Sequence, residues 1–160
     1  LNQFIEKYPN LPSTPYAFYL KGIVAEAKSS SILDNIVTDN AQRDVDSIRD
    51  AYSYYIDLIN IFPNSKYSED ALTKLPILVN TLARHELYVA IYYTGIGSNI
   101  AAINRSKFII QNYPNSSSIS DSLHLMAYNY EAINALQLAS DVRQVLSSNY
   151  PNYSPNYSIK

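Results

Sequence analysis

The chain has 160 residues and a formal net charge of −2, from 12 Lys and Arg against 14 Asp and Glu. This length suits one domain with a real core, and the weak, scattered charge excludes the basic surface that nucleic-acid binding requires. Three glycines and no cysteine argue against phosphate loops, hairpin-rich sheets, disulfides and thiolate metal sites, and favour an all-α fold. Because the sequence begins with Leu1 and its single methionine is Met126, we interpret it as a mature or trimmed fragment.

Amphipathic spacing predicts helices along the chain. Apolar side chains recur every three or four residues from Val45 to Phe62. They recur again at Leu72, Leu75, Val79, Leu82, Val89 and Tyr93, with the charged Glu86 as one member of this stripe. The predicted helices, in chain order, lie at about 1–8, 14–28, 44–62, 67–93, 98–112, 119–134 and 136–149. No stretch approaches the roughly 20 apolar residues of a membrane-spanning helix.

Three segments interrupt this pattern. Pro76 lies within the long fourth helix and is expected to kink it or to split it near residue 75. Residues 29–43 are polar and weakly periodic, which predicts a loop inserted between paired helices. The tail at 150–160 contains Pro-Asn-Tyr-Ser twice, at 151–154 and 155–158, and is expected to be a frayed, non-helical end.

The amphipathic segments repeat. Four of them end in an aromatic-Pro-Asn triplet, where proline stops a helix: Tyr8-Pro9-Asn10, Phe62-Pro63-Asn64, Tyr113-Pro114-Asn115 and Tyr150-Pro151-Asn152. Small and aromatic residues precede the later prolines at fixed spacings: Ala51, Ala102 and Ala139, then Tyr93 and Tyr130, then Ala90 and Ala127. This order is typical of the tetratricopeptide repeat (TPR), in which small residues let two antiparallel helices approach closely. We therefore predict a single TPR-like α-solenoid over residues 1–149, with a partial first unit.

The sequence offers no signature of catalysis. His85-Glu86 lacks the second histidine of a zincin helix, and His124 stands alone on its helix without a clear relay partner. We expect no catalytic residue, no cofactor and no metal site. An all-helical enzyme would require Glu86, His85 and His124 to meet in one open cleft.

Two charged residues stand out among the apolar positions. Glu86 lies on the apolar stripe of its helix, where an unpaired carboxylate would cost several kcal/mol. It can pair within the repeat with Arg105 or Arg84. Alternatively, Arg105 faces outward as an anchor for a partner protein, because arginine is enriched at binding hot spots. The clusters Tyr52/Tyr54/Tyr55 and Tyr92/Tyr93 also allow two interpretations, packing in the core or contact with a partner. One member of each cluster is expected in the core.

Several of these motifs together resemble one family. The similar segments are Asn2-Gln3-Phe4-Ile5, Tyr16 with Tyr19-Leu20-Lys21-Gly22, Arg43-Asp44, residues 62–67 with Asp70-Ala71, residues 82–90 with Tyr92-Tyr93, and Ala101-Ala102-Ile103-Asn104-Arg105. In this order and spacing they resemble the BamD (YfiO or ComL) family of outer-membrane β-barrel assembly lipoproteins. The similarity covers about residues 1–152.

The resemblance implies a non-enzymatic scaffold of TPR units. It implies a lipid anchor at an N-terminal cysteine, absent from this chain, that holds the protein to the periplasmic face of the outer membrane. The implied partners are the last POTRA domain of the barrel protein BamA, the accessory lipoproteins BamC and BamE, and unfolded outer-membrane proteins.

The resemblance also implies where those partners bind. Arg105 matches the family arginine that couples to BamA, and Arg84, Glu86 and Tyr88 lie beside it in the BamA-type site. A possible groove for substrates or accessory proteins contains Tyr16, Tyr19, Arg43 and Asp44. The chain lacks the family's first repeat, and its neighbourhood of Tyr88 is less charged than is usual. A different TPR adaptor of the bacterial envelope stays open as the alternative.

Overall fold

The computed structural model describes residues 1–29 and 45–158. Within these ranges the chain forms helices and no strand, which confirms the all-α prediction. The helices are α1 (Asn2–Lys7), α2 (Thr14–Ser29), α3 (Val45–Ile61), α4 (Lys66–Gly95), α5 (Asn99–Asn112), α6 (Ile119–Ala132) and α7 (Leu136–Asn149). Their bounds lie within about two residues of the predicted ones, because proline triplets and short polar turns fix helix ends locally. None of these helices has the length and the apolar character that crossing a membrane would take.

The chain divides into two compact units, Leu1–Leu82 and Ala83–Lys160, and α4 runs from the first into the second. The predicted single domain over residues 1–149 stays a prediction, and most of the predicted insert at 29–43 lies outside the described residues.

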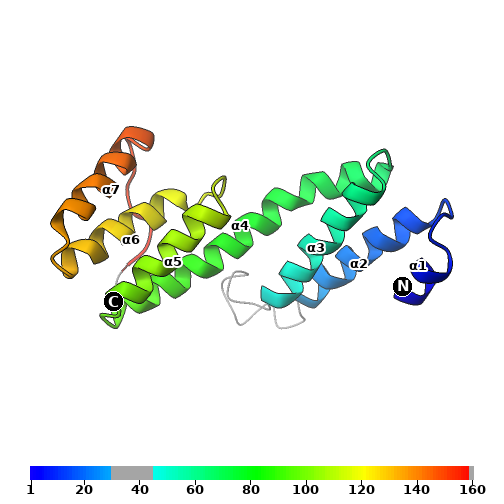
Figure 1. Ribbon diagram of the computed structural model, residues 1–160, viewed down its shortest axis with the longest axis horizontal. Helices are drawn as coiled ribbons and strands as arrows, with labels where there is room; N and C mark the ends of the chain where they lie inside the picture. The colour runs from blue at the N-terminus through cyan, green and yellow to red at the C-terminus, as the bar shows by residue number, and fades with distance from the viewer. Residues whose placement is uncertain (30–44, 159–160) are drawn as a thin grey trace. The chain divides into compact units, whose positions relative to one another are not determined.

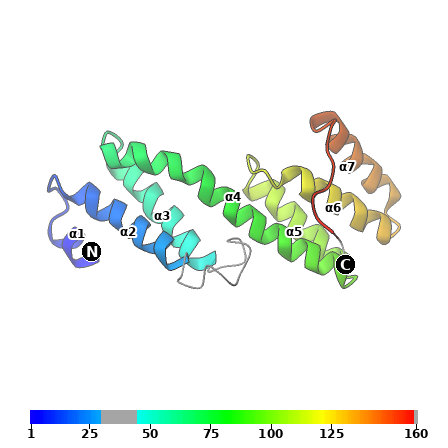
Figure 2. The ribbon, with the colours of Figure 1, turned by 180° about the vertical axis from the view of Figure 1, so that it is seen from behind.

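In the first unit, α2 and α3 pack side by side as an antiparallel pair, and α1 packs on α2 (Figures 1 and 2). The centre of this pair is formed by Ala51, Tyr55 and Leu58 of α3, all fully buried. Gly22 of α2 faces the Tyr55 ring so closely that a Cβ atom there would overlap it. Glycine therefore sets how near α2 comes to α3.

In the second unit, α5 packs on α6 and α6 packs on α7 (Figure 1). The small residues predicted to lie between helices are all buried, each at most 2% exposed: Ala90, Ala102, Ala127 and Ala139, with Ala51 of the first unit. This confirms the TPR-like pairing that their spacing predicted. The core around them includes Leu87, Ile103, Leu125, Tyr130 and Leu146.

Helix α4 continues as one helix through Pro76. Of the two predicted alternatives, a kink and a split near residue 75, the split is therefore excluded. Its buried face in the first unit contains Ala71 and Leu78, whereas Leu72 is 53% exposed. The predicted stripe was wrong here because the packed neighbours, and not hydrophobicity alone, decide which face of a helix is buried. A buried alanine carries no apolar signal strong enough to mark it.

The tail also departs from expectation. It forms no helix, as predicted, but it is not a frayed end, because Tyr153 and Tyr157 pack against the core of the second unit. Figure 1 shows the tail running back from the end of α7 along the helices of this unit. Aromatic side chains in a non-helical segment supply the buried area that holds it there.

Candidate partner-binding site

The second unit contains an ion pair between α4 and α5. The Arg105 guanidinium donates from Nη1 to Oε2 of Glu86 over 2.8 Å. The Glu86 side chain is only 4% exposed, while that of Arg105 is 44% exposed. Of the two partners that the sequence allowed for Glu86, the structure shows an ion pair with Arg105. One side of the guanidinium thus compensates a buried carboxylate, and the rest of it is open to solvent.

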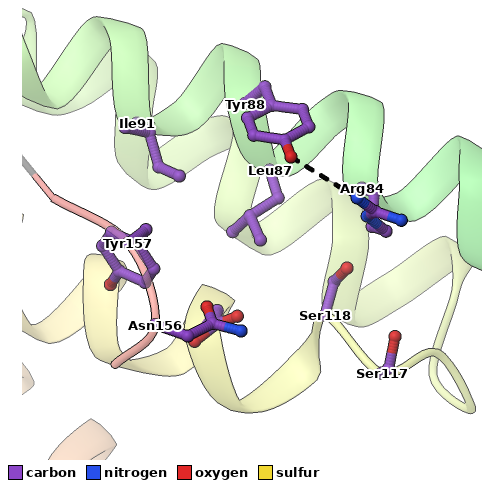
Figure 3. Close-up of a pocket in the computed structure, with 9 residues that line it drawn as sticks. Arg84, Leu87, Tyr88, Ile91, Ser117, Ser118, Asn156 and Tyr157 are labelled. Carbon is purple, nitrogen blue, oxygen red and sulfur yellow. Dashed lines mark hydrogen bonds between the residues drawn. The ribbon is translucent and has the colours of Figure 1, made fainter. Parts of the chain in front are cut away.

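Arg84 and Tyr88 lie one helical turn apart on α4. Arg84 Nη2 is 3.5 Å from the Tyr88 hydroxyl, a weak hydrogen bond. Both side chains line a cavity of about 370 Å³ between α4, the α5–α6 connection, α6 and the tail (Figure 3). Its apolar wall is formed by Leu87 and Ile91, and Ser118 and Asn156 face them from the other side. A volume of this size falls within the range of ligand pockets.

Two phenols of the tail contact α6, and one of them, Tyr157, lines the cavity. The Tyr153 hydroxyl donates to Oδ1 of Asp121 over 2.6 Å. The Tyr157 hydroxyl lies 2.5 Å from Nδ1 of His124, and its ring meets the imidazole edge-on at 5.9 Å. Burial and the nearby carboxylate of Asp121 raise the pKa of both phenols, so both stay protonated and able to donate.

Sequence reasoning missed this cluster. His124 was interpreted as a lone histidine, but its partner Tyr157 is 33 residues away in a segment without periodicity. The available signal was the doubled Pro-Asn-Tyr-Ser motif, which places two tyrosines four residues apart in a chain that cannot be helical. Aromatic residues at regular spacing in such a tail indicate contact surface.

In the first unit, tyrosines form a row between α2 and α4. The Tyr16 ring lies 5.1 Å from that of Tyr67, and the Tyr19 ring lies 5.6 Å from Tyr67 and 5.8 Å from Tyr55. The Tyr19 hydroxyl donates to Oδ2 of Asp70 over 2.9 Å. Burial and the Asp70 carboxylate raise the pKa of Tyr19 to about 12. Tyr16 is 44% exposed, so this row presents an aromatic edge to solvent.

The remaining predicted residues add little to a site. Arg43 and Asp44 lie outside the described residues. Of the two tyrosine clusters, Tyr55 is fully buried, but Tyr93 is half-buried and Tyr92 is 63% exposed, so the second cluster has no fully buried member. Tyr92 and Tyr93 lie near the end of α4, which ends at Gly95, so both rings have fewer neighbours.

The three residues that an enzyme would need lie in different surroundings. Glu86 pairs with Arg105 and His124 with Tyr157, and none of Glu86, His85 and His124 lines the cavity. Within residues 1–29 and 45–158, no group of three His, Asp or Glu side chains is placed to hold a metal ion.

The helices form antiparallel pairs with small residues at their contacts, which defines a TPR-like helical-repeat protein. A buried carboxylate holds a half-exposed arginine on its surface, an arrangement that suits protein partners. The comparisons with known proteins identify the family. The model of the YfiO family, described as outer membrane lipoprotein, matches residues 1–146. The chain belongs to this family.

Relatives with curated names support the same assignment. The chain is 38% identical to the outer membrane protein assembly factor BamD of Neisseria gonorrhoeae over 152 residues, 94% of this chain and 57% of the relative. It is 31% identical to the protein of that name from Haemophilus influenzae, over 93% of this chain and 57% of the relative. For the Caulobacter vibrioides protein the identity is 31%, over 94% and 46%. The chain thus spans about half the length of these relatives.

Proposed function

We propose that the chain is a non-enzymatic scaffold in the assembly of outer-membrane proteins and that its second unit binds a POTRA domain of BamA. The names of the relatives, all outer membrane protein assembly factors, support the process and a role without catalysis. The observation that carries the binding proposal is the Arg105–Glu86 pair. A guanidinium fixed on one side by a buried carboxylate loses little side-chain entropy when its exposed side meets a partner.

Around Arg105, the proposed contact surface includes Arg84 and Tyr88 of α4. Arg84 is exposed and Tyr88 is half-buried, so both can contribute to an interface. Arginine and tyrosine are enriched among the residues that dominate binding energy. Because the chain has a net charge of only −2, electrostatic steering contributes little, and the affinity should depend weakly on salt.

The row of tyrosines in the first unit is the proposed groove for unfolded outer-membrane proteins or for BamC- and BamE-type lipoproteins. Its support is the exposed edge of Tyr16 and the hydroxyl of Tyr19, which offer stacking and hydrogen bonds to an extended chain. Arg43 and Asp44 belong to this proposal by sequence alone. In the full-length protein, a lipid anchor at the N-terminus would place the scaffold on the periplasmic face of the outer membrane.

The test is calorimetric titration of the chain with the POTRA domains of BamA from the same organism. Arg105→Glu alone would set two carboxylates together, so the informative variant is Glu86→Gln/Arg105→Gln, which removes both charges and leaves two amides that can hydrogen-bond. Binding by the wild type that falls at least tenfold in this variant, at an unchanged melting temperature, supports the proposal. A matched control, Arg143→Gln on α7, should bind like the wild type.

The alternative is a different TPR adaptor of the bacterial envelope. No binding of POTRA domains by a well-folded wild-type chain would favour it. Equal binding by wild type and variant would keep the scaffold function and remove Arg105 from the interface.

A further inference from the structure

The tail is seated on a surface that the helices provide. Asp121 and His124 lie three residues apart on α6, so they share one face of the helix. Asp121 accepts from the Tyr153 hydroxyl, and His124 shares a hydrogen bond between its Nδ1 and the Tyr157 hydroxyl. The Asp121 residue is 8% exposed and belongs to the buried set of α6. The partners that α6 offers to the two phenols are therefore fixed by the fold.

The spacing of the donors matches a short extended segment. Tyr153 and Tyr157 are four residues apart in a stretch that is not helical. Tyr153 reaches Asp121, Tyr157 reaches His124, and the two phenols also hydrogen-bond to each other. The His124 ring lies 5.6 Å from the Tyr153 ring and 5.9 Å from the Tyr157 ring, so one imidazole contacts both aromatics. A site that hydrogen-bonds a hydroxyl discriminates strongly against the analogue that lacks it. This surface is thus suited to tyrosine over phenylalanine.

The tail fills the surface incompletely. The cavity of about 370 Å³ stays open beside Asn156 and Tyr157 (Figure 3). Ser118 at its edge is 2% exposed, and its hydroxyl has no hydrogen-bond partner among the described residues. A buried hydroxyl without a partner is costly, and such groups call for an explanation such as a missing ligand.

From these contacts we propose that the face of α4 and α6 beneath the tail is a binding site for an extended, tyrosine-bearing segment of a partner protein. Residues 150–158 occupy this site in the free chain as an intramolecular competitor. A tethered segment acts at an effective concentration in the millimolar range, so a partner must bind more tightly than the tail to displace it. This inference goes beyond the proposed function, because it needs no POTRA domain, although the cavity shares Arg84 and Tyr88 with the proposed POTRA surface.

The test uses the full chain and a probe made from its own sequence. The Tyr153→Ala/Tyr157→Ala variant releases the tail and leaves α4 and α6 intact. A fluorescent peptide with the sequence of residues 150–158 is titrated against this variant and against the wild type, and binding is read as anisotropy. We expect the released variant to bind at least tenfold more tightly than the wild type, in which the tail competes.

The control changes only the peptide, so the folding of the protein does not enter. A peptide with phenylalanine in place of both tyrosines should bind the released variant at least tenfold more weakly. Equal binding of the two peptides would overturn the hydroxyl-reading site, and equal binding by wild type and released variant would overturn the competition. Absence of binding to a released variant with a wild-type circular dichroism spectrum would overturn the whole inference. Because POTRA titration reports on Arg105 and peptide titration on α6, failure of one is distinguishable from failure of the other.

Discussion

Arg105 and Glu86 share a 2.8 Å hydrogen bond but not the same environment, since the carboxylate is buried and the guanidinium is nearly half exposed. Removing the arginine therefore takes this cationic partner away from Glu86, whose charge stays buried. Removing the carboxylate leaves an arginine that water can solvate. The pair is asymmetric, and the asymmetry can be measured.

We expect Arg105→Ala to lower the free energy of unfolding by about 1–3 kcal/mol, the cost of leaving a buried acceptor without its donor. Glu86→Gln/Arg105→Ala should lose less, because a neutral amide is cheaper to bury than a carboxylate. Urea unfolding followed by circular dichroism gives both values. Equal losses in the single and double variants would contradict the role assigned to the Glu86 charge.

The contact between Gly22 and Tyr55 leads to a second prediction. Alanine is favoured over glycine within a helix by about 1 kcal/mol, so Gly22→Ala would stabilise α2 if it were isolated. Here the added Cβ would overlap the fully buried Tyr55 ring, and overpacking of this kind costs about 1–3 kcal/mol. We expect a net loss of stability in thermal unfolding.

A matched double variant separates the clash from other effects. Gly22→Ala/Tyr55→Leu should be less destabilised than the sum of its two single variants, because the smaller side chain makes room for the Cβ. Strict additivity would show that the ring is not what excludes a side chain at residue 22.

Pro76 supports a prediction of opposite sign. It lies within α4, where proline cannot donate to the carbonyl four residues earlier and costs about 3 kcal/mol relative to alanine. The Pro76 carbonyl itself accepts from the Asn80 side chain over 2.9 Å. We expect Pro76→Ala to raise the melting temperature, since the residue is exposed and its ring fills no core position. Ile77→Ala, the exposed neighbour, is the control and should change the melting temperature little.

The helices could be predicted because their signals are local. Pro63 and Pro114 stop helices through their own rings, and Ala102 or Ala139 marks a close contact because only small residues fit there. Which face of α4 is buried could not be predicted, because Leu72 and Ala71 are adjacent and only the packed neighbours decide between them. The outcome, an exposed leucine beside a buried alanine, runs against hydrophobicity alone.

The candidate site was predictable where its signal is local in the sequence. A carboxylate on an apolar stripe signals a cationic partner close by, which limited Glu86 to Arg105 or Arg84, and the packing of α5 on α4 decides between them. The contacts of Tyr153 and Tyr157 join positions 32 and 33 residues apart. No periodicity within the tail contains that information, so it required the structure.

The surroundings of His124 lead to the last prediction. Burial lowers the pKa of this histidine, and Arg143 lowers it further, while Asp121 and Glu131 act in the opposite direction. Tyr153 and Tyr157 also face the ring and stay protonated, so they add no charge. In the folded chain the lowered pKa favours the neutral imidazole, which hydrogen-bonds through Nδ1 with the Tyr157 hydroxyl, whereas in the unfolded chain the imidazole takes up a proton near pH 6.5.

The sign follows from proton linkage. Below about pH 6.5 the unfolded state binds more protons than the folded state, so stability is highest above this pH and falls as the pH decreases. We expect the urea midpoint of the wild type to decrease between pH 7.5 and 5.5, a window above the range in which most carboxylates titrate. His124→Gln, which keeps a hydrogen-bonding side chain but does not titrate, should lose much of this decrease, and His85→Gln should retain it. A decrease of full size in His124→Gln would assign the effect to another group.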